Sequence, residues 1–412
     1  MIRVKKGIER VLEQAVNRAY PVNEKCVIKK VNFGADYQTD LPKKVFDKYK
    51  TGIHTFGMFN EREIADGIFA NCDKSEFIRA VQVSGIGDLQ VFINENYICT
   101  VFNKIIKDQV IKIDKSGFND LLLCHLIEDF REIETLAYFR TELLVKSLKK
   151  IIFEFGGVLG ENRTIALNQK GSDCDTSKSK VQNLFKADIP LNVDKKIWIQ
   201  ELSSVFKQTL SFSSIFYLFN SHNSDKFLSN SPFPSIFSVH PYGSLFKSFS
   251  TGLDSDFMPL VNEFSKLSSE KLVQEPIFYY NLFKVPRTSC GLVSFTPPSK
   301  TLDSIWSVFT IYPQLTYSLP IDPLTHSDVQ NNLRPILIHI LTIPDTLSTC
   351  IQSCSMHHLI SWIESLTELY IKTDSQLTPE CKNKLNFLSK LALDYTFSLI
   401  HIDLPQIPLN KL

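Results

Sequence analysis

A strand–turn–strand pattern is the feature of this sequence that most restricts how the chain can fold. Phe77–Val83 and Leu89–Ile93 are rich in Val, Ile and Phe, and the turn between them, Ser84–Asp88, contains two glycines. Two such runs around a short glycine-containing turn predict a pair of antiparallel strands. A sheet of this kind needs an apolar cover on one face, so the same domain is expected to contribute helices.

Residues 1–112 are therefore predicted to form a compact α+β domain with an antiparallel sheet. Apolar residues at helical spacing predict a first helix that ends at Pro21, because proline cannot continue a helix. Asn60 and Glu63 have the spacing of a capping box, which predicts the start of another helix. Strand character over Cys26–Phe33 and a last helix from about Tyr97 complete the expected domain.

The middle region, 113–270, is harder to interpret. Leu121–Lys150 has the composition of a helix pair, and Gly171–Lys180 is small and polar, as in a loop. The pattern predicts no defined architecture for the rest of this region.

The last part, 271–412, is predicted to be all-α. Apolar residues at helical spacing cover Val329–Cys354 and Met356–Lys372, and a further helix is expected to begin at Pro379. Three helices with short connections predict a small bundle.

Composition excludes several classes of function. The net charge of 45 − 44 = +1 is too small for a protein held on nucleic acid by bulk positive charge alone. No stretch approaches the roughly 18–20 apolar residues of a membrane helix, and no apolar segment follows the charged start of the chain, as a secretory leader would require. The nine cysteines include no Cys-x-x-Cys pair. We expect a soluble cytoplasmic protein with reduced thiols, no membrane contact and no cofactor.

Three motifs in the first domain resemble the N-terminal domain of arginyl-tRNA synthetases. Gly34–Asp40 is similar to that domain's Asp-Tyr-Gln segment, Asn60–Ala65 to its N-P-R-E-I-A helix start, and Val81–Ile93 to its strand–turn–strand motif. The motifs occur in the same order and cover most of 1–112. The resemblance implies a domain that holds the outer corner of the L-shaped tRNA, at the D-loop.

The last third resembles the helical anticodon-binding domain of the same synthetases, called the DALR domain. Phe278–Lys284 is similar to its first motif, in which a cation follows a Tyr by four residues. Leu399–Pro405 is similar to its closing helix and tail. The resemblance implies that this part binds the anticodon stem-loop.

The region between these two domains lacks the signatures of a class I synthetase. No His-x-Gly-His motif occurs in the sequence. Thr176–Lys180 is similar to Lys-Met-Ser-Lys-Ser only by chance. The 270 − 112 = 158 residues are expected to be too few for a doubly wound nucleotide-binding fold with an insertion, and no strand pattern leads into a glycine-rich phosphate turn. We therefore expect no aminoacylation and no catalytic residue.

Two outer domains around a non-catalytic centre resemble the family of DALR anticodon-binding domain-containing protein 3. The resemblance implies a tRNA-binding adaptor that recognises arginine tRNAs and presents them to a tRNA methyltransferase that makes 3-methylcytidine in the anticodon loop. Two alternatives stay open. One is an arginine–tRNA ligase or a degenerate or truncated relative of it, and the other is a scaffolding protein without an RNA-binding surface.

Candidate tRNA-binding residues of the first domain lie in a basic stretch. Residues 1–50 hold 12 Lys and Arg against 6 Asp and Glu, and lysines flank Tyr37 and Gln38. A cationic surface beside an exposed aromatic ring can hold phosphates and stack a looped-out base. The resemblance to synthetases adds Gln90 as a reader of a base edge, although Asp88 stands where an aromatic residue is expected. Each of these residues can also be an ordinary member of a surface or core.

In the last domain, Tyr280 and Lys284 lie one helical turn apart, so that the ring can stack on an anticodon base while the ammonium neutralises a phosphate. The other candidates in this domain are Asn281, Tyr370 and Arg334. The tyrosines can instead be core residues. Residues 301–412 hold 6 Lys and Arg against 10 Asp and Glu, which is poor for phosphate contact and also fits a protein-docking face.

Other constellations are weaker. A metal site could be built from Cys350, Cys354, His357, His358 and Cys381, and a Cys–His nucleophile from the same residues. Cysteine, however, is among the most buried residue types and usually packs as a small apolar side chain. Asp173 and Asp175 could hold a cation, but a solvated turn explains them as well.

Overall fold

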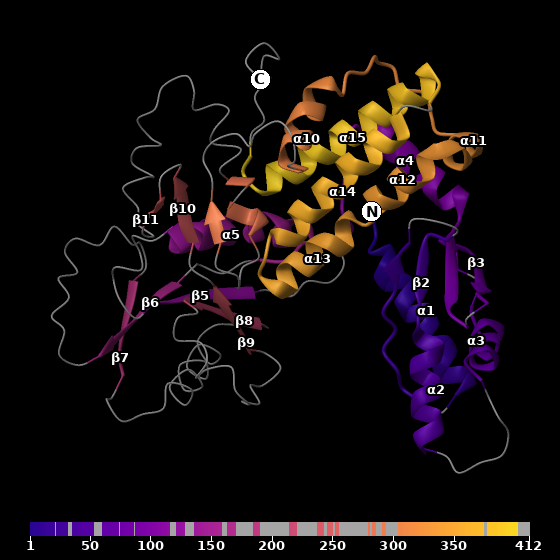
Figure 1. Cartoon of the computed structure of the whole chain (residues 1–412), viewed down its shortest axis with the longest axis horizontal. Helices are drawn as coiled ribbons and strands as arrows, with labels where there is room; N and C mark the ends of the chain where they lie inside the picture. Colours follow the sequence, from indigo (N-terminus) through magenta and orange to yellow (C-terminus); the bar gives the residue numbers. More distant parts are fainter. Residues whose placement is uncertain are drawn as a thin grey trace. The chain divides into compact units, whose positions relative to one another are not determined.

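The computed structural model contains two compact units (Figure 1). It describes residues 1–20, 22–31, 35–52, 60–73, 75–85, 87–115, 121–127, 136–158, 163–169, 184–189, 214–220, 237–242, 245–249, 252–254, 279–280, 282–285, 291–293, 304–374 and 377–402. The first unit consists of Met1–Lys112, Leu315–Thr346 and Ser365–Ala392. The second consists of Ile113–Gln314, Leu347–Glu364 and Leu393–Leu412. Segments that are far apart in the sequence therefore build each unit.

The first unit contains the predicted antiparallel sheet. Its strands lie in the order β1, β2, β4 and β3, and each neighbouring pair is antiparallel. The bounds are β1 (Lys29–Lys30), β2 (Tyr37–Thr39), β3 (Ile78–Val83) and β4 (Leu89–Ile93). Gly87 in the β3–β4 turn has φ +89°, and a Cβ at this position would lie 3.2 Å from Glu61. The predicted strand pair is confirmed. Its turn requires a glycine at this position, because the backbone is left-handed there and passes close to Glu61.

Four helices accompany this sheet, namely α1 (Val4–Ala19), α2 (Leu41–Gly52), α3 (Glu61–Ala70) and α4 (Glu95–Asp108). α1 buries residues at helical spacing and ends just before Tyr20, as predicted. The capping box of α3 is confirmed, because the Asn60 side chain accepts from the Glu63 N–H at 2.9 Å and the Glu63 carboxylate accepts from the Asn60 N–H at 3.1 Å. α4 begins at Glu95, two residues before the predicted start.

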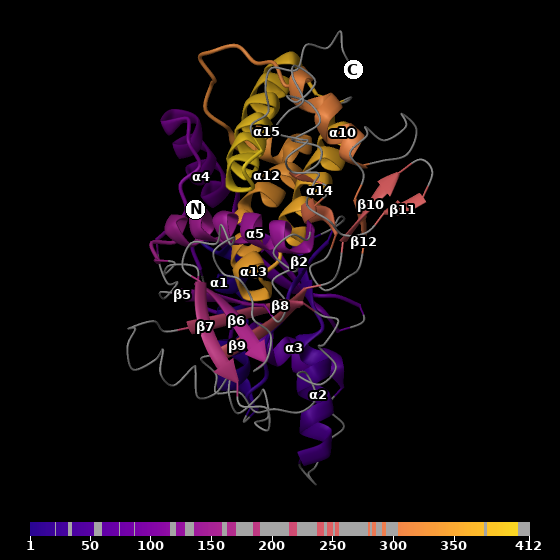
Figure 2. The ribbon, with the colours of Figure 1, turned by 90° about the vertical axis from the view of Figure 1, so that its left-hand side faces the viewer.

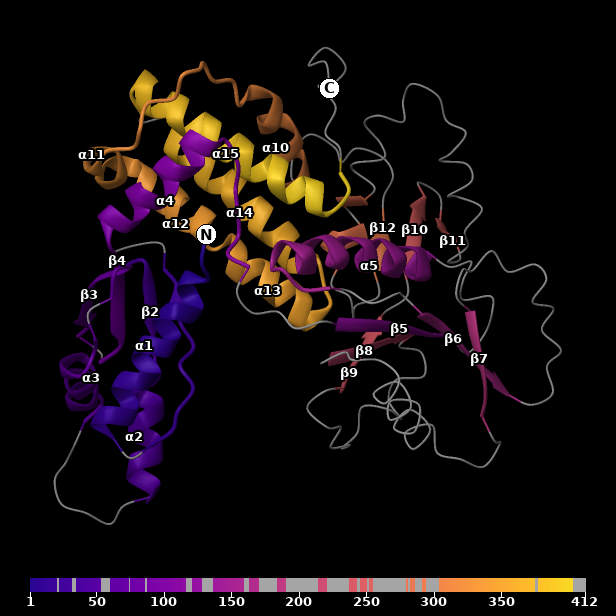
Figure 3. The same ribbon diagram turned by 180° about the vertical axis from the view of Figure 1, so that it is seen from behind.

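From Ser304 onward the C-terminal part of the chain is helical, as predicted (Figure 3). The prediction that all of 271–412 is helical is wrong at Gly291–Val293, which forms a short strand. From His326 onward the elements are α11 (His326–Asp328), the π-helical turn η5 (Val329–Leu333), α12 (Arg334–Leu341), α13 (Ile343–Ser353), α14 (His357–Asp374) and α15 (Pro379–Leu399). α13, α14 and α15 contribute residues to both units. Val329–Cys354 is divided because Pro335 and Pro344 fit only the first turns of α12 and α13. The predicted start of the last helix at Pro379 is confirmed.

The second unit contains a parallel sheet of five strands, in the order β7, β6, β5, β8 and β9 (Figure 2). The bounds are β5 (Leu121–Ile127), β6 (Arg163–Gln169), β7 (Leu184–Ile189), β8 (Ser214–Asn220) and β9 (Phe237–Tyr242). The chain moves outward from the central strand β5 on one side and then returns to the other side, which is the order of a doubly wound sheet. The expectation that this region is too short for such a fold is wrong.

The expected helix pair at Leu121–Lys150 is also wrong. The structure has strand β5 there, followed after a connection by helix α5 (Leu136–Glu154). A strand buried in a parallel sheet is apolar on both faces and shows no alternation, so its short apolar run does not differ from part of a buried helix. The predicted loop Gly171–Lys180 lies outside the described residues.

The second unit also holds a small sheet and a helix. β10 pairs with two neighbours, β11 and β12, and α10 leads into the 3₁₀ turn η4. Their bounds are β10 (Leu245–Phe249), β11 (Gly252–Asp254), β12 (Gly291–Val293), α10 (Ser304–Ile311) and η4 (Tyr312–Gln314). Within the described ranges, no helix combines the length and the apolar character needed to cross a bilayer.

Candidate nucleic-acid interface

Four polar residues lie in one line across the antiparallel sheet. Lys29 on β1 is opposite Gln38 on β2, which is opposite Gln90 on β4, which in turn is opposite Gln82 on β3. Directly opposite residues project from the same face of a sheet, so these four side chains form what we call the polar row (Lys29, Gln38, Gln90 and Gln82). With strands about 4.8 Å apart, the row spans about 14 Å.

The polar row is on the accessible face of the sheet. Lys29 and Gln82, at its ends, are exposed, and Gln38 and Gln90 are partly exposed. The Gln38 amide donates to Asp88 Oδ2 at 2.6 Å, which fixes its orientation. The structure thus brings together the predicted candidates Gln38 and Gln90. Sequence reasoning missed Gln82, although the pairing of the two hairpin strands would have placed it beside Gln90.

Tyr37 does not belong to this face. Its ring is 1% exposed, and its hydroxyl has no hydrogen-bond partner among the described residues. Burial raises the pKa of this hydroxyl. The prediction that Tyr37 stacks on a base is wrong, because neighbours in a strand point to opposite faces and Gln38 takes the accessible one.

The basic stretch 1–50 contributes exposed cations only in part. Among the side chains that the structure describes in this stretch, the exposed lysines are Lys6, Lys25, Lys29, Lys43 and Lys48. Lys44 pairs with Asp40 at 3.0 Å, and Lys48 pairs with Glu24. The local positive charge is therefore partly balanced within the domain itself.

Arg334, the first residue of α12, holds the ends of the two central strands. Its Nε and Nη2 donate to the two carboxylate oxygens of Asp36 at 2.9 and 2.6 Å, just before β2. Nη2 also donates to the Ile93 carbonyl at 2.6 Å, and Nη1 to Glu95 at 3.0 Å, just after β4. Burial opposes the charge, but these hydrogen bonds outweigh it and raise the pKa of the guanidinium. Arg334 is a positioning residue for the strands, which corrects its prediction as an RNA-binding cation.

A pocket of about 160 Å³ lies beside this arginine, lined in part by Lys30, Asp36, Phe92, Arg334, Ile338 and Leu369. The Lys30 ammonium lies 3.1 Å from His339 Nδ1. Burial lowers the pKa of Lys30 to about 8, although Asp36 acts in the opposite direction. Lys30 lies partly buried in this pocket beside His339, so it is less accessible to a phosphate than the exposed lysines of the same domain.

The second group of candidates lies in the second unit. Tyr280 is fully buried, and its ring meets the Phe309 ring edge-on at a centroid distance of 5.8 Å. Burial and the nearby Glu364 raise the pKa of its hydroxyl. Lys284 is partly exposed and pairs with the same Glu364 at 3.0 Å. The prediction that Tyr280 stacks on a base is wrong, whereas the role of Lys284 stays a prediction, and Asn281 lies outside the described residues.

Tyr370, on α14, is also a core residue. Its ring is buried, and its hydroxyl donates to Asn386 Oδ1 at 2.8 Å. Burial, together with Asp374, raises the pKa of this hydroxyl to about 12. Its predicted contact with tRNA is therefore wrong, because the amphipathic spacing of α14 turns this position inward.

The cysteines and histidines of the C-terminal part do not form a site. Cys350 and Cys354 are buried, and His357 Nδ1 contacts the Lys284 carbonyl at 2.8 Å. In the part of the chain that the structure describes, no three His, Cys, Asp or Glu residues are placed to hold a metal ion. Burial raises the pKa of Cys350 to about 12, which disfavours the thiolate that a nucleophile needs. Asp173 and Asp175 lie outside the described residues.

Solved structures share this arrangement over almost the whole chain. An arginyl-tRNA synthetase from Plasmodium falciparum is similar with a TM-score of 0.69 at 11% identity, over 98% of this chain and 99% of that chain. The Thermus thermophilus arginyl-tRNA synthetase is similar with a TM-score of 0.68 at 9% identity, over 98% of this chain and 100% of that chain. The chain has an arginyl-tRNA synthetase-like fold. No protein-family model and no curated protein matches it.

The arginyl-tRNA synthetase-like fold includes the middle region, which the sequence motifs did not identify. A similarity over 98% of the chain necessarily takes in the parallel sheet. The signal that could have indicated this sheet is the pair of continuous apolar runs at Leu121–Ile127 and Ser214–Asn220, which are typical of strands buried on both faces. The described strands between 121 and 242 therefore keep the doubly wound strand order.

Proposed function

We propose that this chain is a cytoplasmic, non-catalytic tRNA-binding adaptor of the DALR anticodon-binding domain-containing protein 3 type. In this proposal it recognises arginine tRNAs and presents them to a tRNA 3-methylcytidine methyltransferase. The fold supports a role with tRNA, and the connection that follows β5 argues against nucleotide chemistry. That connection is the observation on which the proposal depends.

In a doubly wound sheet, phosphates bind at the carboxyl ends of the central strands, where a glycine-rich turn leads into a helix N-terminus. In this chain the connection between β5 and α5, residues 128–135, reads Glu-Asp-Phe-Arg-Glu-Ile-Glu-Thr. It has four acidic residues, one arginine and no glycine. A local charge of −3 repels a triphosphate, and the sequence also lacks the His-x-Gly-His signature.

The polar row supports RNA as the ligand. Glutamine amides can pair with the edges of unstacked bases, and Lys29 at the end of the row can neutralise a phosphate. The net charge of the chain is only +1, so binding by the row depends on base contacts more than on bulk electrostatics.

The test is filter binding of an arginine tRNA to the purified chain, with other tRNAs as competitors and at two salt concentrations. We expect arginine tRNAs to compete at least tenfold better than the others. Addition of a tRNA 3-methylcytidine methyltransferase should then raise the methylation of arginine tRNA only when the chain is present. Equal and weak binding of all tRNAs would contradict the proposal, since it would leave only non-specific electrostatics.

A second candidate, an arginine–tRNA ligase, is favoured by the parallel sheet, whose strand order is that of a nucleotide-binding fold. An arginine-dependent ATP–pyrophosphate exchange assay separates the two functions. We expect no exchange above a buffer control. Exchange that requires arginine would overturn the adaptor proposal.

A further inference from the structure

The segment Thr316–Pro323, which we call the anchored loop, lies along α15 in the first unit (Figure 3). Asn383 of α15 accepts from the Ser318 N–H at 2.8 Å and donates to the Ser318 carbonyl at 3.0 Å. Asn386 donates to the Thr316 carbonyl at 2.7 Å and is itself held by Tyr370. Two buried or partly buried amide side chains therefore hold the backbone at the start of the loop.

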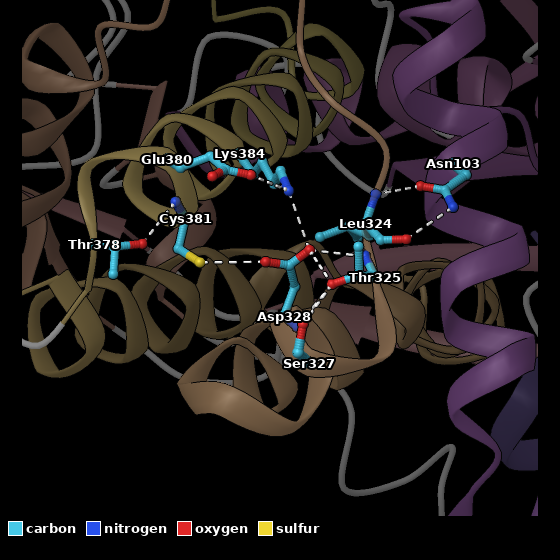
Figure 4. Close-up of polar contacts among 9 residues, drawn as sticks. All are labelled: Asn103, Leu324, Thr325, Ser327, Asp328, Thr378, Glu380, Cys381 and Lys384. Carbon is cyan, nitrogen blue, oxygen red and sulfur yellow. Dashed lines mark hydrogen bonds and ion pairs between the residues drawn. The ribbon is translucent and has the colours of Figure 1, made fainter.

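The residues that follow the loop are held as firmly (Figure 4). Asn103 of α4 accepts from the Leu324 N–H at 2.6 Å and donates to the Leu324 carbonyl at 3.1 Å. Thr325 and Asp328 form a capping box, and Asp328 pairs with the buried Lys384 at 3.1 Å. Hydrogen bonds to the carboxylate outweigh its desolvation and lower the pKa of Asp328, so the pair stays charged. Both ends of the loop are thus fixed by side chains from other elements.

Between these anchors the loop exposes apolar side chains. Leu319 is 58% exposed and Tyr317 is 39% exposed, although the Tyr317 ring rests edge-on against Phe387 at 5.1 Å. Pro320 and Pro323 are exposed as well. Ordered apolar groups on a surface favour association, because binding then costs little conformational entropy.

The charge of this region argues for a protein partner. Residues 315–333 contain no Lys or Arg, so the loop offers no cation to a phosphate. Of their two Asp, Asp328 is neutralised by Lys384, and Asp322 is exposed on the loop. An enzyme that itself holds tRNA carries a basic surface, which is complementary to Asp322. The exposed tyrosine, leucine and prolines of the loop, with no cation among them, are suited to an apolar hollow with a basic rim on the partner protein.

We propose that the anchored loop docks the tRNA-modifying partner enzyme, with Leu319 and Tyr317 inserted into an apolar hollow whose rim is basic. This inference rests on the proposed adaptor function. It makes the anchored loop the protein-binding site of the chain and leaves RNA to the polar row.

The experiment measures the dissociation constant between the full-length chain and a purified tRNA 3-methylcytidine methyltransferase by calorimetry, and in parallel the affinity for arginine tRNA. We expect Leu319→Ser to weaken enzyme binding at least tenfold, and Leu319→Arg to weaken it more than Leu319→Glu because of the basic rim. Asn383→Ala, which removes only an anchor, should weaken it by a smaller factor. Phe69→Ser is the matched control, since Phe69 is 49% exposed but lies on α3.

The outcomes are distinguishable. Loss of enzyme binding in the Leu319 variants with unchanged tRNA affinity supports the inference. If the wild-type chain binds the enzyme and Leu319→Ser and Leu319→Arg bind it equally well, the inference is wrong and the adaptor function stands. If the wild-type chain binds tRNA but no methyltransferase, both the inference and the adaptor role fail. Stronger tRNA binding by Leu319→Arg without an effect on the enzyme would reassign the loop to RNA.

Discussion

Gln38 and Gln90 of the polar row and the C-terminal tyrosines were all predicted to bind tRNA, and the structure separates the two groups. In the sheet, Gln38 and Gln90 are partly exposed and share one face. Among the helices, Tyr280 and Tyr370 are buried. The difference comes from geometry. A strand places alternate residues on opposite faces, whereas on a helix the positions that suit base stacking are also the positions that suit a core.

The largest expected effect concerns the residue that supports the polar row. Arg334→Ala removes the cation that pairs with the buried Asp36 and one of the two arginines that pair with Glu95, and we expect the free energy of unfolding to fall by about 3–5 kcal/mol. Arg79→Ala is the control, because Arg79 bonds the same Glu95 from a side chain that is 48% exposed, and it should cost less than about 1 kcal/mol. Urea denaturation measures both. Equal losses would mean that Arg334 does not hold the strands.

A second test concerns α1, the first helix of the same domain. Its N-terminus is capped from α13, where Asp345 accepts from the Lys5 and Lys6 N–H groups at 3.0 and 3.4 Å. Burial raises the pKa of Asp345 from 3.8 to about 6, while those two hydrogen bonds act in the opposite direction. Because the folded pKa is the higher one, the stabilisation is complete below pH 3.8 and is lost as the pH rises through 6.

The difference of about 2 pKa units sets an upper bound of about 3 kcal/mol on this change. Asp345→Asn keeps a hydrogen-bond acceptor but cannot titrate. Between pH 4 and pH 7 the free energy of unfolding of the wild type should therefore fall relative to that of this variant. Urea denaturation at both pH values checks this. Parallel pH profiles for the two proteins would show that Asp345 does not titrate in this window.

The third test measures the contribution of the polar row to tRNA binding. Gln90→Ala removes an amide that can read a base, so we expect arginine tRNA to bind more weakly by about 1–3 kcal/mol, with unchanged stability. Gln14→Ala is the matched control, since Gln14 is exposed on α1. If both variants bind tRNA as the wild type does, the polar row is not the interface.

The smallest effect is expected at the buried tyrosine. Tyr280→Phe keeps the ring in the core and should change tRNA affinity by less than about 0.5 kcal/mol. Tyr280→Ala is not informative about binding, because the cavity alone should cost about 3–5 kcal/mol of stability. If the phenylalanine variant lost tRNA affinity while keeping full stability, Tyr280 would be part of the RNA interface after all.

Local patterns were sufficient for much of the fold. The hairpin at Ile78–Ile93, the capping box of Asn60 and the start of α15 at Pro379 were predictable because each depends on residues within a few positions of one another. The parallel sheet was not predicted, because the partners of β5 are strands far along the chain and its apolar run carries no period.

The amino-acid sequence by itself determined the hairpin, the helix starts at Glu61 and Pro379, that the connection after β5 is acidic, and that the class I signatures are missing. Only the tertiary structure decided which candidates face the solvent and which are fixed inside. Arg334 illustrates the reason, since its partner Asp36 lies 298 residues away. Burial and pairing depend on residues that meet only after folding, and no local pattern contains that information.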